Sequence, residues 1–411
     1  MEHETAAGRP WLAFVESNTT GTGRLFCASA RARGYRPVVL TRDPARYPYV
    51  VLDRVDTRVV DTSDLSAVLD ACARLAEGAG LAGVTSSSEY FIATAAAAAA
   101  KFGLSAPDPQ AVEQCRDKTR QRVVLAHAGV NVPRFAEVND TASAVRTAEA
   151  FGLPVVVKPV SGSGSIGVRL CTTAAEVEHW CGGLFAAAGT NDRGRILVEE
   201  YVDGDEYSVE TFDLNAIAVV RKHLGPAPHF VEVGHDFPAP LAPGDHDRLT
   251  GTVLRALSAL GLGWGAAHTE LRMSARGPVV IEVNPRLAGG MIPHMIQSAA
   301  GLDLVDAVIA RASGHGVAAR LSSRAHGAIR FLVGQESGVV ASVGELPGPD
   351  DVPGLVAASF NVSPGDRVEV THSFKDRLAY VITTGNSADE AERAASRALA
   401  CMSVEYLRSS A

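Results

Sequence analysis

The spacing of short apolar segments changes partway along this chain, and that change limits the possible folds more than any other feature. In roughly the first hundred residues, apolar segments at 11–15, 37–40 and 82–85 alternate with segments of helix length. Such alternation is typical of βαβ units around a parallel sheet. Beyond residue 151, short strands follow one another with few long helices between them, which predicts an antiparallel sheet with helices on one side.

The same patterns predict individual elements. An alanine run at 95–100 predicts a buried helix. A helical pattern covers residues 108–130, and Pro133 follows it before a strand at 135–138 and a helix that ends at Phe151. Further strands are expected at 154–159, 168–171, 195–202, 207–212, 216–223, 266–273, 279–284, 328–333, 339–343, 367–370 and 378–383, and a final helix from Ser387 onward.

Charge and composition exclude several classes of protein. The 411 residues carry a net charge of −8 without a Lys- or Arg-rich run, so we expect no nucleic-acid partner. No apolar stretch approaches the ~18 residues of a membrane span, and the N-terminus lacks a signal-peptide layout, so we expect a cytoplasmic protein without a membrane partner. The six cysteines contain no Cys-x-x-Cys pair, which favours reduced, structural thiols.

A strand that ends in lysine leads directly into a glycine-rich loop. The sequence Val-Val-Val-Lys158-Pro is followed by Ser161-Gly-Ser-Gly-Ser-Ile-Gly167. Glycines let backbone N–H groups approach an anion closely, and Lys158 adds a positive charge beside them, so the loop is suited to covering phosphates. Taken alone, the loop could equally be a flexible hairpin with an exposed lysine. Because the lysine precedes the glycines, the order is not that of a P-loop.

Two later segments alternate polar and apolar residues. His268, Glu270 and Arg272 share one face of the first, and Glu282, Asn284 and Arg286 share one face of the second. Two carboxylates and an amide oxygen on adjacent strands form a site suited to Mg²⁺, which also takes ligands from substrate phosphates. A salt-bridged solvent face is the alternative, but the apolar neighbours of Glu282 indicate a buried strand, where a carboxylate needs a partner or a metal.

A third segment, residues 196–210, is an apolar strand that turns acidic, bends at Gly204 and resumes as a strand. The main chain of such a hinge can hydrogen-bond the edge of a purine, and a carboxylate can accept hydrogen bonds from both ribose hydroxyls. In isolation it would be an ordinary acidic turn between two strands.

These three segments in this order resemble the ATP-grasp superfamily over roughly residues 110–300, and within it the branch of L-amino acid ligases that make dipeptides and related amides. The resemblance implies an ATP-grasp fold in which two antiparallel sheets enclose ATP, within a multidomain chain of mixed α/β and α+β class. The expected parts are a Rossmann-like parallel-sheet domain at 1–107, a central domain with a helical entry and the glycine-rich loop at 108–212, a catalytic part with the metal site at 213–314, and a closing α+β subdomain at 315–411.

The resemblance also implies roles for individual residues. Lys118 and Lys158 would hold phosphates, Glu199 would meet the adenine amino group, and Glu206 would bind the ribose. Glu270, Glu282 and Asn284 would ligate two Mg²⁺ ions, with Mn²⁺ as a possible substitute. The full set expected to contact ATP is Lys118, Lys158, Ser161, Gly162, Ser163, Gly164, Ser165, Gly167, Glu199, Glu200, Tyr201, Val202 and Glu206.

The implied activity is the joining of an amino acid or related carboxylate to an amine or second amino acid through an acyl phosphate, with release of ADP and phosphate. Lys158 and Arg286 would neutralise charge during phosphoryl transfer, and Arg272, Arg286 or backbone N–H groups would stabilise the later oxyanion. Small-molecule carboxylate and amine substrates are the expected partners, and a homodimer stays open. The candidate substrate contacts are Glu232, His235, His268, Arg286, Gly289, Gly290 and Met291.

Other functions stay open at this point. A carboxylase or a carrier-protein ligase would use the same phosphate chemistry on another acceptor. An ATP-binding sensor without turnover is disfavoured because Glu270, Glu282, Asn284 and Arg286 are all present. A nicotinamide-dependent reductase would rest on Gly21 and Gly23 after the first strand, but Phe26 replaces the third glycine of that motif.

Overall fold

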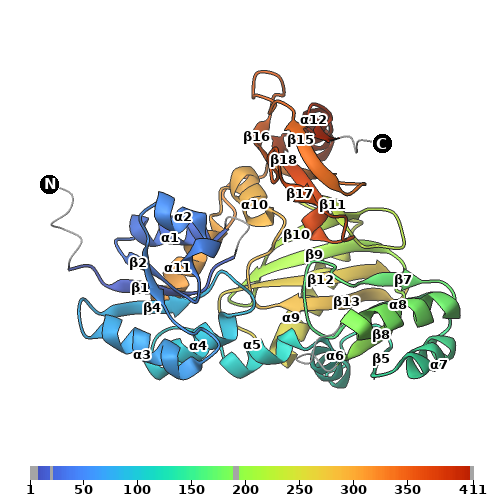
Figure 1. The fold of residues 1–411 in the computed structure, drawn as a ribbon, viewed down its shortest axis with the longest axis horizontal. Coiled ribbons are helices and arrows are strands. Elements are labelled where there is room, and N and C mark those ends of the chain that lie inside the picture. Colours follow the sequence, from blue (N-terminus) through green and yellow to red (C-terminus); the bar gives the residue numbers. More distant parts are fainter. Residues whose placement is uncertain (1–7, 19–21, 188–193, 408–411) are drawn as a thin grey trace.

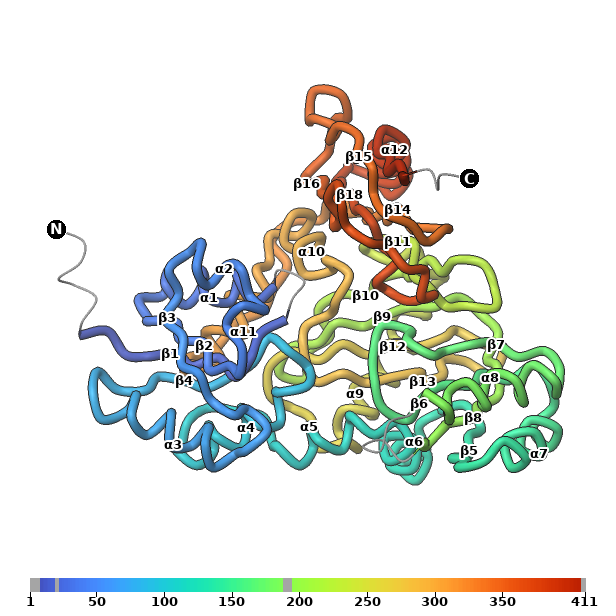
Figure 2. The backbone as a smooth tube through the Cα atoms, in the orientation of Figure 1, coloured from blue at the N-terminus to red at the C-terminus, as the bar shows by residue number. Residues whose placement is uncertain are grey.

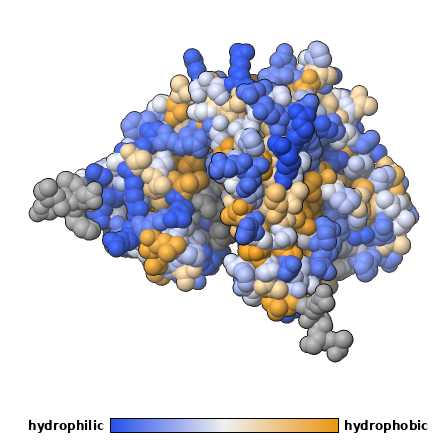
Figure 3. All heavy atoms as spheres, turned by 90° about the horizontal axis from the view of Figure 1, so that it is seen from above, coloured by the Kyte–Doolittle hydropathy of each residue, from blue (hydrophilic) through white to orange (hydrophobic). Residues whose placement is uncertain are grey.

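The computed structural model describes residues 8–18, 22–187 and 194–407, and the strands in these ranges form four sheets. Gly21 of the dinucleotide-binding alternative therefore lies outside the described residues. Figure 1 shows a parallel-sheet domain on one side, two antiparallel sheets facing each other on the other, and a C-terminal part above them. Figure 3 shows a mainly hydrophilic surface on the upper face, with scattered hydrophobic residues.

The N-terminal sheet is parallel, as predicted, with strand order β3-β2-β1-β4. Alanines at positions 95, 96, 98 and 99 are buried in α4, which confirms the predicted buried helix. The sequence patterns missed β3, whose residues Asp-Thr-Arg-Val contain no apolar run. The elements of this domain are β1 (Trp11–Val15), α1 (Thr22–Ala32), β2 (Arg36–Thr41), η1 (Pro44–Arg46), α2 (Pro48–Leu52), β3 (Asp56–Val59), α3 (Leu65–Ala76), β4 (Leu81–Thr85) and α4 (Ile92–Lys101).

The helical segment expected at 108–130 is two helices, α5 (Pro109–Arg116) and α6 (Lys118–His127). Asp117 separates them because it has extended backbone angles and its side chain accepts a hydrogen bond from the Arg120 N–H, which caps α6. The break places Lys118 at the first position of α6, where its N–H donates to the Val160 carbonyl next to the glycine loop.

A small antiparallel sheet with strand order β5-β8-β6-β7 forms one wall of the functional region. Helices α7 and α8 pack against each other and against the sheet, around a core of small and β-branched residues. The elements are β5 (Phe135–Val138), α7 (Thr141–Phe151), β6 (Val155–Pro159), β7 (Arg169–Cys171), α8 (Ala174–Ala187) and β8 (Ile196–Glu200).

The second antiparallel sheet has eight strands in the order β13-β12-β9-β10-β11-β14-β18-β16. The sheet contains strands from both sides of two expected domain boundaries. Strand β9 comes before the boundary at 212/213, and strands β14, β16 and β18 come after the boundary at 314/315. Its elements are β9 (Asp205–Phe212), β10 (Asn215–Leu224), β11 (Glu232–Phe237), α9 (Asp245–Ala259), β12 (Ala266–Ser274), β13 (Gly277–Asn284), α10 (Ile292–Ala300), α11 (Leu304–Ala312), β14 (His326–Val333), β16 (Leu355–Phe360), β18 (Arg377–Gly385) and α12 (Ala388–Ala400).

A three-stranded sheet of β15 (Gly338–Val343), β17 (Arg367–Val368) and β19 (Val404–Tyr406) completes the C-terminal part, with the short helix η2 (Phe374–Asp376) before β18. Five cysteines are buried and Cys401 is exposed, and none forms a disulfide, as the spacing predicted. No helix in the described part is long and apolar enough to cross a membrane.

Candidate functional site

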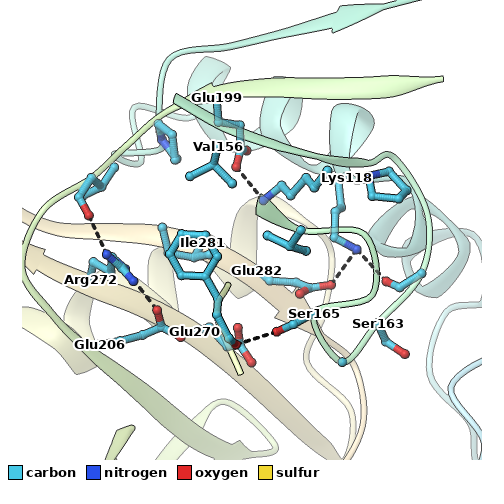
Figure 4. A pocket seen from close by; sticks show the side chains of 18 of the residues that line it. Lys118, Val156, Ser163, Ser165, Glu199, Glu206, Glu270, Arg272, Ile281 and Glu282 are labelled. Carbon is cyan, nitrogen blue, oxygen red and sulfur yellow. Dashed lines mark hydrogen bonds and ion pairs between the residues drawn. The ribbon is translucent and has the colours of Figure 1, made fainter. Parts of the chain in front are cut away.

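A cleft of about 860 Å³, part of it open to solvent, lies between the small sheet and the large sheet. Strands β6 and β8 supply one wall, strands β9 to β13 supply the other, and the glycine-rich loop borders it (Figures 1 and 4). The cleft thus gathers residues from three sequence segments that were predicted to act together. The predicted residues that line it are Lys118, Lys158, Ser161, Gly162, Ser163, Gly164, Ser165, Glu199, Glu200, Tyr201, Val202, Glu206, Glu232, Glu270, Arg272 and Glu282.

On the small-sheet wall, Lys158 and Glu199 form a buried ion pair with 2.5 Å between Nζ and Oε2. Arg122, fully buried on α6, donates to the other oxygen of Glu199 at 2.7 Å. Burial opposes ionisation of Glu199, yet the cations Arg122 and Lys158 together hold its pKa below the ordinary value. Both oxygens of Glu199 are therefore engaged in this state, and Arg122 is a neighbour that the sequence patterns did not reveal.

Lys118 links the glycine loop to the acidic strands. Its Nζ donates to the Gly162 carbonyl at 2.6 Å and lies 3.1 Å from Glu282 Oε1 (Figure 4). The side chain is only 8% exposed, so it is held in the cleft rather than solvated on a helix surface. Lys118 therefore lies where the resemblance to ATP-grasp enzymes implied, in the lining of the cleft.

The glycine loop needs backbone conformations that favour glycine. Gly162, Gly164 and Gly167 have φ values of 110°, 64° and 73°, respectively, and Ser165 also has a positive φ, of 62°. The Ser165 hydroxyl donates to the Phe230 carbonyl at 2.8 Å. Gly167 was also predicted to contact ATP, but it does not line the cleft. It lies at the end of the loop, where it packs against Pro159 and Leu184.

The two polar strand segments pair as predicted. In the antiparallel register of β12 and β13, Glu270 lies opposite Glu282 and His268 opposite Asn284. The edge strand β13 is held from outside by Gln121, whose amide exchanges two hydrogen bonds with the backbone of Val283. Two carboxylates thus face the cleft side by side.

The donor set of Glu270, Glu282 and Asn284 fits Mg²⁺, which prefers oxygen ligands and keeps positions for phosphate and water. No group of three or more His, Cys, Asp or Glu side chains in the described residues could hold a metal by itself. The set therefore suits an ion that arrives with a phosphate substrate, rather than a permanently caged ion.

Lys222 is the principal cleft residue that the sequence analysis missed. It is 2% exposed, and its Nζ lies 2.9 Å from Glu206, 2.8 Å from Glu232 and 2.8 Å from Glu270. Burial disfavours the ammonium, but these three carboxylates raise its pKa well above the ordinary value. The only available signal was a lysine in the basic end Arg-Lys-His of β10, directly after the apolar run Ala-Ile-Ala-Val-Val.

Arg272 lies beside the hinge that joins β8 to β9. Its Nε is 3.0 Å from Glu206 Oε2, its Nη1 donates to the Val202 carbonyl at 3.0 Å, and its guanidinium lies over the Tyr201 ring (Figure 4). Arg272 thus contacts the segment expected to hold adenine and ribose.

Arg286 and Asn284 border a second, smaller pocket of about 390 Å³ that shares Gly162 with the main cleft. Arg286 Nε and Nη2 both contact Oε2 of Glu89, at 2.9 and 2.6 Å. Glu89 follows β4 in the N-terminal domain, so this pocket joins that domain to the acidic strands. Glu89 was not among the predicted residues, because nothing in its local sequence distinguishes it from a surface acid.

Two histidines are among the remaining substrate candidates, and both are buried. His268 lies between Glu210 and Glu270; burial disfavours its imidazolium, but the two acids raise the pKa of His268 to about 9. Gly290 lies against His235, and a Cβ at Gly290 would come within 2.8 Å of His235 Nε2.

Glu232 forms ion pairs with Lys222 at 2.8 Å and with Arg377 of β18 at 2.5 Å. Arg377, like Lys222, was not predicted. Met291, at the start of α10, has a positive φ of 63°, and Gly289 has open space where a Cβ would lie.

The chain is similar to known proteins in both sequence and fold. Residues 151–294 match the ATP-grasp domain family, and residues 330–406 match the family described as L-amino acid ligase C-terminal domain 2. The uncharacterized protein y4rH of Sinorhizobium fredii is 37% identical over 392 residues, which cover 95% of this chain and 82% of that protein.

Two characterised proteins are more distant. Alanine–anticapsin ligase of Bacillus subtilis is 28% identical over 265 residues, and the match spans 59% of this chain and about half of that ligase, 56%. The crystal structure of an L-amino acid ligase from Bacillus licheniformis superposes with a TM-score of 0.83 at 22% identity, covering 97% of this chain and 99% of that one. At this identity the superposition shows a shared fold.

Proposed function

Because the chain belongs to the ATP-grasp superfamily, in its L-amino acid ligase branch, we propose that it joins an amino acid or related carboxylate to an amine through an acyl phosphate. The observation that carries this proposal is the pairing of Glu270 with Glu282 across β12 and β13, beside Lys118 and under a glycine-rich loop. A nucleoside triphosphate would find suitable partners at this end of the cleft. The lysine and the backbone N–H groups can bind phosphate oxygens, and the paired acids can bind the accompanying metal ion.

ATP would occupy the main cleft. Lys118, Lys158 and the backbone of residues 161–167 would hold its phosphates, the main chain of Tyr201 and Val202 would meet the adenine, and Glu206 would accept hydrogen bonds from the ribose hydroxyls. The basic groups now paired with carboxylates would then exchange partners, because a triphosphate brings several negative charges to lysines that each carboxylate matches with only one. Glu199 would take the adenine amino group only by giving up part of its contact with Lys158.

Glu270, Glu282 and Asn284 would hold Mg²⁺, or Mn²⁺ in its place, which supplies neutralisation of the phosphate oxygens. The side chains of this protein would align the carboxylate substrate with the γ-phosphate of ATP. A carboxylate oxygen attacks the γ-phosphorus, the bond to the bridging oxygen breaks, and ADP leaves with that electron pair. Lys158 at the phosphates stabilises the charge of this step, and no side chain acts as a nucleophile.

The second step forms the amide. The amine attacks the acyl carbon and a tetrahedral oxyanion forms next to Arg286. Its collapse expels phosphate, which takes the proton that the amine gives up. Water must be excluded until then, because it would hydrolyse the acyl phosphate. The pocket that joins Glu89, Asn284 and Arg286 lies next to the phosphate end through Gly162, which is where the carboxylate has to bind. Glu232, His235, His268 and the segment 289–291 would shape the rest of the substrate site.

The test is product analysis by ³¹P NMR after mixing the full-length protein with Mg-ATP and pairs of amino acids and small amines. We expect ADP and phosphate to appear only with a particular carboxylate and amine, together with their amide. Formation of AMP and pyrophosphate would mean an adenylate mechanism and would overturn the proposal.

Substitution of a proposed metal ligand provides the control for the site. Glu282→Ala should lower the rate of ADP formation by at least about 100-fold while circular dichroism shows an intact fold, because it removes one of two acidic ligands. Glu113→Ala, at an exposed position of α5, should behave as wild type. Turnover retained by Glu282→Ala would refute the assignment of the metal site.

A further inference from the structure

The chain segment between β17 and β18, residues 371–376, reaches across from the C-terminal part to the glycine-rich loop (Figure 2). The backbone N–H of Phe374 donates to the Gly164 carbonyl at 3.1 Å. The Phe374 ring fills the space beside Gly164, since a Cβ built there would lie 2.2 Å from its Cδ1. We call residues 371–376 the C-terminal tip.

Hydrogen bonds within the C-terminal tip fix its conformation independently of its contact with the glycine loop. Ser373 and Asp376 form a reciprocal capping box at η2, and both side chains are buried. Asp376 also accepts hydrogen bonds from the N–H and the hydroxyl of Thr371, at 2.8 and 2.9 Å. A segment whose polar groups satisfy one another in this way presents Phe374 in a single position.

A second contact supports the first. The His372 ring stacks on the His229 ring with centroids 3.8 Å apart and planes within 2°. The next residue, Phe230, accepts the hydrogen bond from Ser165 of the glycine loop, and Pro228 accepts one from Leu170 of β7. The segment 228–230 therefore joins the C-terminal tip to the same loop from the other side.

The glycine loop needs such support because its sequence favours flexibility. Glycine has the greatest backbone freedom of all residues, and Gly162, Gly164 and Gly167 all adopt positive φ values. Backbone N–H groups can hold a phosphate only if the loop is ordered at the moment of reaction. Elsewhere on the loop, the Tyr90 hydroxyl lies 3.4 Å from the Ser163 hydroxyl and Lys118 donates to the Gly162 carbonyl at 2.6 Å, while Gly164 is contacted by the C-terminal tip.

We propose that the C-terminal tip is a latch, in which Phe374 acts as a positioning residue that holds the glycine loop closed over the cleft. The C-terminal part thereby takes part in closing the active site, although none of its tip residues lines the cleft. The consequence for the reaction rests on the proposed function: a closed loop protects the acyl phosphate from water. The contact itself does not depend on that function, so the two can be tested separately.

Hydrogen–deuterium exchange of the full-length protein without nucleotide tests the contact. In Phe374→Ala, the amides of residues 161–168 should exchange about tenfold faster than in wild type, because local opening becomes easier. Phe374→Tyr keeps the ring and should restore slow exchange, and Lys375→Ala, at the exposed neighbouring position, should change nothing. His372→Ala, which removes the stack alone, should give a smaller increase. Unchanged exchange of the loop in both Phe374→Ala and His372→Ala would overturn the latch.

The reaction provides the second readout. With Mg-ATP and the substrate pair found by product analysis, Phe374→Ala should release several ADP molecules per amide, and Phe374→Tyr should restore the wild-type ratio. An unchanged ratio would overturn the role of the latch in excluding water. If the wild-type protein forms no ADP with any pair, the proposed function fails, while the exchange experiment still decides whether the latch exists.

Discussion

At the scale of single residues, nearly every buried charge in the cleft is paired. Lys222 has three carboxylate partners, and Glu199 lies between Arg122 and Lys158. Such pairing is required because an isolated buried charge costs several kcal/mol. His235, a neutral side chain near Glu232 that does not line the cleft, lacks such a partner: it is 1% exposed, and neither ring nitrogen has a hydrogen-bond partner among the described residues. Its nearest carboxylate oxygen, from Glu232, is 3.5 Å away.

His235→Leu should therefore stabilise the folded protein while it lowers ligase activity. An unpaired buried polar group costs about 1–3 kcal/mol, and leucine removes that cost in a similar volume. Burial lowers the pKa of His235 to about 3, so the unfolded chain binds more protons than the folded chain between pH 6.5 and 3. Wild type should lose stability as the pH falls through that window, and His235→Leu should lose less. Denaturant melts at pH 8 and pH 5 check this; equal pH sensitivity of the two proteins would contradict it.

At the scale of elements, the N-terminal sheet is held to the rest of the molecule by close packing of β4 against α11. Gly83 makes this approach possible, since a Cβ there would lie 2.5 Å from the Ala312 carbonyl oxygen and 2.6 Å from Leu12 Cδ1. Arg33, directly after α1, also forms an ion pair with Asp306 of α11 at 2.5 Å. Helix α11 thus fixes the N-terminal domain, and with it Glu89, relative to the acidic strands.

Gly83→Ala should destabilise the protein by about 1–3 kcal/mol, because the added methyl group overpacks a contact with a backbone carbonyl that cannot move freely. Gly183→Ala is the matched control: it lies in α8 with nothing within 4 Å of a new Cβ, and alanine should stabilise that helix by up to about 1 kcal/mol. Chemical denaturation of both variants measures the two free energies of unfolding. A neutral Gly83→Ala would show that β4 and α11 separate without cost.

At the scale of the whole molecule, the C-terminal residues are part of the eight-stranded sheet that forms one wall of the cleft. Strand β14 pairs with β11 from Gly234 to Phe237, and β18 and β16 continue the sheet outward. One hydrophobic core contains Phe14 of the N-terminal domain, Met295 of α10 and Ile382 of β18. This one core cluster therefore joins three parts of the chain that lie far apart in the sequence.

A chain that ends at residue 314 should consequently fail to fold. It lacks β14, β18 and β16, so the edge of β11 and part of the shared core are exposed, and an exposed edge strand promotes aggregation. Size-exclusion chromatography and circular dichroism of the 1–314 and full-length proteins compare the two states. A monomeric 1–314 chain with cooperative unfolding would show that the eight-stranded sheet folds stably without its last three strands.

Local patterns in the sequence were sufficient for part of the site. The strand ending in Lys158, its glycine loop, and the alternation around Glu270 and Glu282 each lie within a few residues, so periodicity and residue type predicted them. The break at Asp117 and the strand β11 could not be predicted in the same way. Asp117 acts through a capping hydrogen bond inside a helical pattern, and β11 is a polar segment with a glycine that becomes a strand because β10 and β14 flank it.

The sequence by itself thus determined the parallel N-terminal sheet, the antiparallel strands and the chemical types that line the cleft, because each depends on the order of neighbouring residues. Only the tertiary structure decided which distant groups meet: Lys222 with three acids, Glu89 with Arg286, and Phe374 with the glycine loop. The physical reason is that such contacts depend on how strands pair and elements pack across the chain, whereas local propensity reports only the conformation of each segment.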